Sequence, residues 1–210
     1  MIWRTIQIPE TYSFWDLHVA LQDAMGWLDY HLHFFRVSKP GTGETVQIGI
    51  PDDDAFEGDE PILPGWEIPV ATYFPQCGAA AQYEYDFGDG WEHEVILEAM
   101  SPRQRGKRYP LCLGGARSCP PEDCGGVGGY ENLLAVLRDP THDEYESTLQ
   151  WVGRRFDPEY FDPKRVKFDD PGRRWELAFE QPVRRRRPVR HATSLANNRL
   201  ERSRARRVRR

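Results

Sequence analysis

The residue types that carry chemistry are concentrated in one stretch of eleven residues, 83–93, with the sequence YEYDFGDGWEH. The candidate site residues within it are Asp86, Asp89, Glu92 and His93. Carboxylates and an imidazole at this spacing can hold a divalent ion and a water, or can act as an acid–base pair. The same stretch carries Trp91, whose indole can instead be presented to a partner.

The stretch also has the pattern of a β-hairpin, which offers a purely structural explanation. Residues 83–85 alternate in polarity, Gly88 and Gly90 interrupt the pattern, and residues 93–98 resume it. Asp-Gly between two alternating runs favours a tight turn, because glycine adopts positive φ at no steric cost. In this interpretation the aspartates hydrogen-bond their own backbone and Trp91 caps the core. The sequence leaves both interpretations open.

Three cysteines within thirteen residues, Cys112, Cys119 and Cys124, form a second cluster in a segment rich in glycine and proline. Thiolates are good zinc ligands, and glycine lets the backbone wrap around a tetrahedral ion. The cluster therefore predicts a structural zinc ion as a cofactor. The alternative is that these cysteines are small buried side chains in a loop with little other core.

A tetrahedral zinc site needs a fourth ligand, which the cluster itself does not supply. His93 on the expected hairpin is the first candidate, followed by His31 or His33. Cys77 is a poor candidate, because it lies in a separate turn of proline and glycine. The predicted ligand set is therefore Cys112, Cys119, Cys124 and His93.

Charge divides the chain into an acidic body and a basic tail. Residues 181–210 contain twelve arginines and one glutamate, a net charge of +11, whereas residues 1–180 hold 16 basic and 32 acidic side chains, a net charge of −16. The tail has no apolar stripe, so we expect it to be disordered in isolation. Its arginines favour contact with nucleic acid, with an acidic protein surface or with the body itself. The acidic body argues against a nucleic-acid groove spread over the whole domain.

The composition also bears on location. The sequence has no run of 18 apolar residues, so we expect no membrane span, and no secretory signal is visible at the N-terminus. A cytoplasmic location follows as an expectation, with the four cysteines in their reduced form.

Hydrophobic periodicity places the elements that must position these candidates. Residues 14–25 predict an amphipathic helix that Ser13 caps and Gly26 ends. The remaining expected elements are strands in 1–8, 31–37 and 46–50, the hairpin, helices in 130–137 and 142–152, and a last helical turn in 175–179. Residues 51–69 and 99–128 are expected to be loops.

This order predicts an α+β domain over residues 1–180, a compact alpha-beta roll with a mostly antiparallel sheet and packed helices, followed by the disordered basic tail at 181–210. There is no βαβ alternation and no glycine-rich phosphate loop at the start of a helix, which argues against nucleotide binding.

Several motifs, in this order, resemble one known family, which is named after the third open reading frame of an Ri plasmid. The matching segments are IWR at 2–4, MGW at 25–27, YHLH at 30–33, the whole of 83–93 and CPPEDCGG at 119–126. Some members are called insertion-element passenger proteins and carry a resolvase-like name. The resemblance extends to about residue 168 and implies the alpha-beta roll, but it implies little about activity. The sequence shows no recombinase signature, so that activity is not carried over.

The chain departs from the family pattern at three places. Members usually begin with a strand before the IWR segment, whereas here Met1 directly precedes it, so we expect a lost first strand or a late start codon, and an exposed sheet edge. The arginine-rich tail is not part of the family pattern. Position 124 is often apolar in the family, which weakens Cys124 as a ligand.

Three hypotheses for function follow. The favoured one is a non-enzymatic binding module of plasmid or mobile-element origin, associated with nucleic acid or a nucleoprotein. The second is a metal-dependent or acid–base enzyme that uses the hairpin acids and His93. The third is a protein–protein adaptor whose recognition surface is formed by Trp15, Trp27, Trp66 and Trp91.

Overall fold

The computed structural model describes residues 1–51 and 60–180, and its first helix forms where the sequence predicts it. Helix α1 spans Phe14–Met25. The Ser13 hydroxyl accepts a hydrogen bond from the Asp16 amide at 3.2 Å, and the Asp16 carboxylate accepts one from the Ser13 amide at 2.9 Å. This reciprocal capping box fixes the start of the helix. Gly26 ends it with a φ of 93°, which only glycine adopts readily.

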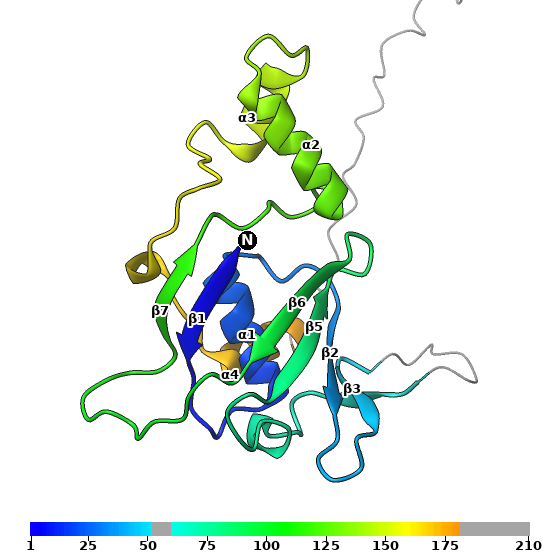
Figure 1. Cartoon of the computed structure of the whole chain (residues 1–210), viewed down its shortest axis with the longest axis vertical. Coiled ribbons are helices and arrows are strands. Elements are labelled where there is room, and N and C mark those ends of the chain that lie inside the picture. Colours follow the sequence, from blue (N-terminus) through cyan, green and yellow to red (C-terminus); the bar gives the residue numbers. More distant parts are fainter. Residues whose placement is uncertain (52–59, 181–210) are drawn as a thin grey trace, which may run out of the picture.

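The main sheet has five strands in the order β4-β3-β2-β5-β6 (Figure 1). Their bounds are β2 His33–Ser38, β3 Thr45–Gly49, β4 Ile62–Pro64, β5 Ala80–Tyr85 and β6 Trp91–Ile96. All neighbouring pairs are antiparallel except β3 and β4. The expected α+β fold with a mostly antiparallel sheet is therefore confirmed.

Side-chain alternation gives this sheet one apolar face. On it Phe35, Val37, Tyr83 and Tyr85 are buried, and they form a single core with Phe14 of α1. The opposite face carries polar residues such as Arg36 and Gln82, which hydrogen-bond to each other at 2.9 Å. The core thus lies between α1 and one face of the sheet, as the period-two pattern of the strands requires.

A second sheet pairs the first strand of the chain with a strand from its middle. Strand β1, Trp3–Gln7, runs antiparallel to β7, Leu111–Ala116, with a shift in register between Thr5 and Ile6. Helix α1 contacts both β1 and β3, so it joins the two sheets.

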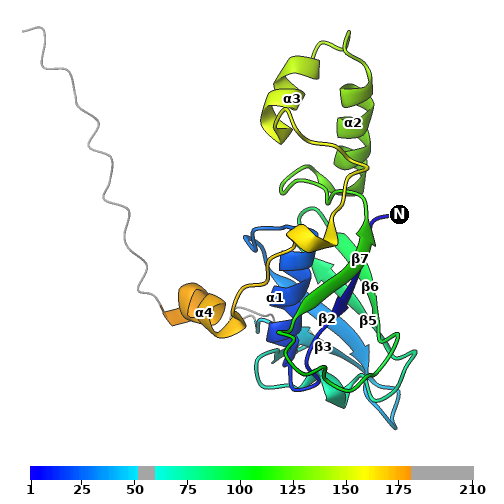
Figure 2. The same cartoon turned by 90° about the vertical axis from the view of Figure 1, so that its left-hand side faces the viewer.

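The remaining helices lie outside the sheets. Helices α2 (Gly126–Arg138) and α3 (Tyr145–Val152) pack against each other and project from one end of the molecule (Figures 1 and 2). Helix α4, Pro171–Trp175, packs against α1 and continues into the π-helical turn η3, Glu176–Glu180. The short 3₁₀ turns are η1, Val70–Thr72, and η2, Pro163–Arg165.

The expected loops were only partly correct. The segment 51–69 contains the short strand β4, and the segment 99–128 contains β7 and the start of α2. Hydrophobic alternation does not reveal either strand, because β4 has only three residues and β7 includes two adjacent glycines. Helix α2 begins at Gly126 rather than at 130, although its first turn is rich in glycine. Residues 52–59 and the tail at 181–210 lie outside the described residues.

In the described ranges, no helix is both long and apolar enough to traverse a bilayer.

Arg4 fastens the two-stranded sheet to α1. Its guanidinium donates to the carbonyl of Ala24 at 2.9 Å, to that of Ala116 at 2.9 Å and to that of Arg117 at 2.8 Å. The same group lies 3.7 Å above the ring centre of Phe161. One planar cation thus satisfies a carbonyl at the end of α1 and two at the end of β7.

We predict that Arg4→Lys lowers the free energy of unfolding by about 2–3 kcal/mol, because one ammonium cannot reach three carbonyls and stack on a ring. Chemical denaturation measures the change. Arg138→Lys, at an exposed position near the end of α2, is the matched control and should change stability by less than about 0.5 kcal/mol. Equal effects of the two substitutions would contradict the assignment.

Candidate functional site

Of the two aspartates of the predicted hairpin, Asp86 braces the turn and Asp89 ties the turn to a neighbouring loop. The turn joins β5 to β6, and the Gly90 amide donates to the Asp86 carbonyl at 2.6 Å. The Asp86 Oδ1 accepts hydrogen bonds from the amides of Gly88 at 3.0 Å and Asp89 at 3.3 Å. The Asp89 Oδ2 accepts one from the Gly125 amide at 3.1 Å. The contacts of Asp86 agree with the structural interpretation of the stretch, whereas the side chain of Asp89 bonds to a different loop.

The structure does not gather the four hairpin candidates into one site. Glu92 and His93 are consecutive in β6 and therefore point to opposite faces of the sheet. Glu92 is exposed, whereas the ring of His93 packs edge-on against Trp27 with centroids 5.2 Å apart. The part of the hairpin that carries Asp86 lies instead against His31 and Asp123.

The four tryptophans of the predicted adaptor surface do not share one surface. Trp15, Trp27 and Trp91 are buried, and Trp27 lies 6.1 Å from Trp91 inside the core. Trp66 is half-buried and, like Trp15, contacts Trp175 of α4, away from the pair formed by Trp27 and Trp91. The prediction of a single recognition surface was wrong, because large rings contribute most to stability in the core.

The cysteines lie on the rim of the core. Cys112 is in β7 opposite Ile6, and Cys119 and Cys124 pack against the core cluster. Burial is the first cause that raises the pKa of all three thiols, that of Cys124 to about 11. Within residues 1–51 and 60–180, no group of three possible metal-ligand atoms lying within 4.8 Å of one another includes a cysteine. The zinc site stays a prediction, and filling it would require these side chains to move together and lose their protons.

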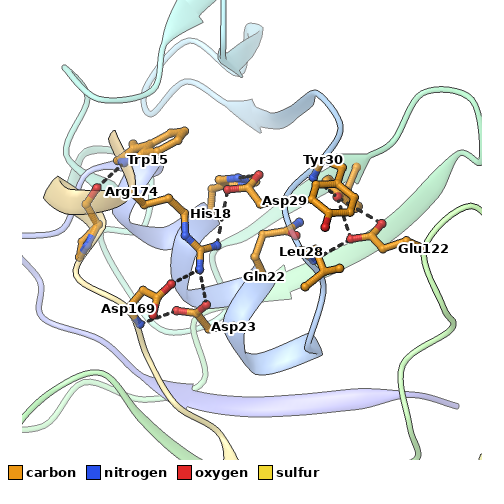
Figure 3. Close-up of polar contacts among 12 residues, drawn as sticks. Trp15, His18, Gln22, Asp23, Leu28, Asp29, Tyr30, Glu122, Asp169 and Arg174 are labelled. Atoms are coloured by element: carbon orange, nitrogen blue, oxygen red, sulfur yellow. Dashed lines mark hydrogen bonds and ion pairs between the residues drawn. The ribbon is translucent and has the colours of Figure 1, made fainter. Parts of the chain in front are cut away.

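A buried polar chain that sequence reasoning missed runs from α1 into the sheet, and Figure 3 shows its end at His18 and Asp29. The His18 Nε2 lies 2.8 Å from the carboxylate of Asp29, and its Nδ1 lies 2.9 Å from the hydroxyl of Tyr83. Because a carboxylate only accepts, we assign the proton to Nε2, which leaves Nδ1 to accept from Tyr83. The Tyr83 oxygen in turn accepts from the Gln22 amide at 2.9 Å. Every link of the chain therefore has a donor and an acceptor.

His33 of β2 lies flat against His18, with ring centroids 3.4 Å apart and planes 5° from parallel. Both rings are fully buried, and burial lowers the pKa of His18 and lowers that of His33 further still. Burial also raises the pKa of the Tyr83 hydroxyl well above its ordinary value. The chain resembles a catalytic relay in its residue types, and its central rings are buried away from solvent.

The sequence did contain a signal for this chain. His18 and Gln22 follow Phe14 at intervals of four residues, so they lie on the apolar stripe of the helix. A polar residue on a core-facing stripe must find a buried partner. The partners come from segments far along the chain, which periodicity does not identify.

Comparison with known proteins identifies the family of the domain. Residues 1–165 match the family described as plasmid pRiA4b ORF-3-like protein. The chain belongs to this family.

Two relatives of this pRiA4b ORF-3-like protein support the assignment. It is 37% identical over 154 residues to "Uncharacterized protein y4hQ" of Sinorhizobium fredii, a match that covers 73% of this chain and 74% of the relative. It is 48% identical to a solved structure, the protein of unknown function MM3350 from Methanosarcina mazei Go1, with a TM-score of 0.72. That match covers 80% of this chain and 90% of the other.

In this family member, a segment that follows the matched region covers the buried chain. Arg174 of α4 lies 3.5 Å from Asp29 and 2.7 Å from Asp23 (Figure 3). Burial tends to raise the pKa of Asp29, but the hydrogen bond from His18 and the charge of Arg174 hold it below its ordinary value. The Asp29 carboxylate is therefore ionised and pairs with both partners.

We predict that the stability of the protein falls as the pH falls through 6.5, the ordinary pKa of histidine. Below this pH both imidazoles bind a proton in the unfolded chain, whereas the buried rings of His18 and His33 stay neutral in the folded protein. The free energy of unfolding therefore falls by about 1.4 kcal/mol per pH unit for each ring. His33→Phe keeps a flat ring in the stack and removes one titrating group. Its melting temperature should therefore decline less between pH 7.5 and 5.5 than that of the parent.

The exposed His142 supplies the control for this measurement, since His142→Gln should decline in parallel with the parent. A His33→Phe curve that also parallels the parent would show that the stacked pair does not govern the pH response.

Proposed function

We propose that this pRiA4b ORF-3-like protein is a non-enzymatic binding module that recognises a short protein segment carrying an arginine followed by an aromatic residue. The observation that supports this function is that its own residues 169–179 dock onto the family domain in this manner. The segment begins after residue 165, where the family match ends. The surface that receives it is built by α1 and the loop at 65–69.

Aromatic rings make the first part of the contact. Trp175 lies 4.5 Å from Trp66 and 5.4 Å from Trp15, measured between ring centroids. Phe179 adds a ring 4.2 Å from Trp175. The indole nitrogen of Trp15 also donates to the Pro171 carbonyl at 3.0 Å. Rings from both sides thus interleave, and one hydrogen bond fixes the backbone of the segment.

An arginine makes the second part of the contact. Arg174 is largely buried between Asp23 and Asp29, and Asp23 also accepts a hydrogen bond from the Asp169 amide at 2.8 Å. A guanidinium held by several carboxylates is a specific contact, because its planar donors must match the positions of the oxygens. Lysine at this position would not replace these contacts.

The docked segment leaves room beside it. A groove of about 470 Å³ lies between the start of α1, the loop at 65–69 and α4. Aromatic and acidic side chains line it, among them Trp15, Asp16, Trp66, Glu67 and Trp175. The lining suits a cationic and aromatic ligand, since it offers stacking surfaces and negative charge together.

A partner segment of the same chemistry would compete with the chain's own residues for this surface. Its apparent affinity would be reduced by the fraction of molecules in which residues 169–179 are docked. Weakening the internal contact should therefore increase the affinity for a partner segment supplied in solution.

We predict that the full chain with Arg174→Ala and Trp175→Ala binds a labelled peptide of residues 167–180 at least about tenfold more tightly than the parent does. Fluorescence anisotropy measures the affinity. The control variant, Arg173→Ala, changes the exposed neighbouring arginine and should bind the peptide as weakly as the parent does. Equal affinities for the double variant and the parent would contradict the proposed function.

A second candidate ligand is nucleic acid, favoured by the net charge of +11 on residues 181–210. An arginine cluster neutralises phosphates and releases counterions, which gives affinity without sequence preference. The acidic body does not contribute to such binding. In this second proposal the tail binds nucleic acid while the family domain, in the cytoplasm, holds a protein partner.

We predict that a chain ending at residue 180 loses binding to duplex DNA and keeps the melting temperature of the full chain within about 2 °C. The full chain should bind with an affinity that falls steeply as salt rises from 50 to 200 mM. Electrophoretic mobility shift and thermal melting make the two measurements. A large loss of stability would show instead that the tail docks on the acidic body.

A further inference from the structure

We propose that His31, Asp86 and Asp123 form a site for a divalent transition-metal ion at the base of the hairpin turn. Each residue offers one ligand atom, and the three atoms lie within 4.8 Å of one another. In the described part of the chain they are the one group of three histidine, cysteine or acidic residues that meets this distance. The site is separate from the predicted cysteine cluster, and it does not depend on the proposed peptide groove.

The distances around His31 suit a shared ion. The Nε2 of His31 lies 2.9 Å from Asp123 Oδ1 and 3.5 Å from Asp86 Oδ2. Adjacent ligand atoms of an octahedral ion with bonds of about 2.1–2.2 Å are separated by about 3 Å. The three atoms therefore need only small shifts to surround one ion.

The ring nitrogen of His31 is left unsatisfied by the protein. Although two carboxylates lie this near, neither meets Nε2 in hydrogen-bond geometry, and this buried nitrogen has no other hydrogen-bond partner in the described ranges. A buried polar atom without a partner is costly. An ion between the carboxylates would give this atom the partner that the chain does not supply.

Backbone contacts hold the three ligands in place. The Asp86 amide donates to the Leu32 carbonyl at 3.0 Å, which ties the hairpin to the segment that carries His31. The hydrogen bond from Gly125 to Asp89 ties the same hairpin to the loop that carries Asp123. Asp86 accepts its turn-bracing bonds through Oδ1, which leaves Oδ2 for a ligand. Sites with this degree of preorganisation lose little entropy on binding.

Glu122, which directly precedes Asp123 in the loop, adds a further contact around the site (Figure 3). It accepts a hydrogen bond from the Tyr85 hydroxyl at 3.1 Å, and the Tyr30 amide donates to that hydroxyl at 3.1 Å. The segments on either side of the site are thereby joined through one tyrosine of the sheet.

The site opens to solvent on one side. The Asp86 side chain is 8% exposed, that of His31 29% and that of Asp123 66%. An ion there would keep water on its open face. One imidazole with two carboxylates suits Mn²⁺, Fe²⁺ or Zn²⁺ better than Ca²⁺, which prefers oxygen ligands alone.

Mn²⁺ is the probe for the test, with the full chain first treated with chelator. We expect one Mn²⁺ per chain by isothermal titration and by electron paramagnetic resonance, together with a rise in melting temperature. Asp123→Asn changes the exposed ligand, so the fold should persist while the affinity falls at least about tenfold. Asp143→Asn alters an exposed acid elsewhere and should bind Mn²⁺ as the parent does.

Two further variants make the result decisive. His31→Gln should also lose the Mn²⁺-induced rise in melting temperature, whereas Cys119→Ser should retain it, because the thiol cluster is not part of this site. No saturable binding by the parent, or an Asp123→Asn variant that binds as tightly as the parent, would overturn the proposal. A loss of binding in Cys119→Ser would assign the ion to the thiols instead.

Discussion

The stacking of His18 on His33 is the contact on which the arrangement of the domain depends, because it places two imidazoles where helix α1 meets the centre of the main sheet. Two rings at this distance cannot both be charged in a buried site. Burial keeps the pKa of His18 below its ordinary value although Asp29 raises it, and Asp29 and Tyr83 take the two nitrogens of the neutral ring in complementary roles. The carboxylate of Asp29 then needs a cation, and Arg174 supplies it. One packing contact in the core thus requires a carboxylate in the loop after α1 and a cation in the segment that follows the family-matched region.

This dependence explains why local elements were predicted well and the network was not. Helix α1 was predicted to the residue because Ser13, Asp16 and Gly26 determine its ends locally. The hairpin was equally local, since its glycines and Asp86 define the turn. Strand β7 was missed because its pairing with β1 is a long-range contact and its two glycines give no alternation. The role of Arg174 was missed for the same reason, since its partners Asp23 and Asp29 lie far from it in the sequence and no local pattern identifies them.

The candidate sites show the same division. The sequence identified Asp86 as a candidate site residue, but it grouped Asp86 into one site with Glu92 and His93. Alternation along β6 separates those two, whereas folding brings His31 and Asp123 to the turn from two other loops. Membership of the pRiA4b ORF-3-like family establishes the fold over residues 1–165, and the contacts made by residues 169–179 extend beyond it. The proposed binding surface therefore combines the family domain with residues outside it.

The pairing of β1 with β7 has a consequence for how the chain folds. Trp3 lies opposite Ala116, so the first strand has no partner until more than half of the chain has left the ribosome. Contacts of such sequence separation close late, since the entropy of a long loop must be lost before the pairing is formed. During that interval β1 presents an unpaired edge, which is the kind of surface that chaperones and other nascent chains encounter. The pairing of β1 with β7 therefore covers a strand edge that the nascent chain exposes during synthesis.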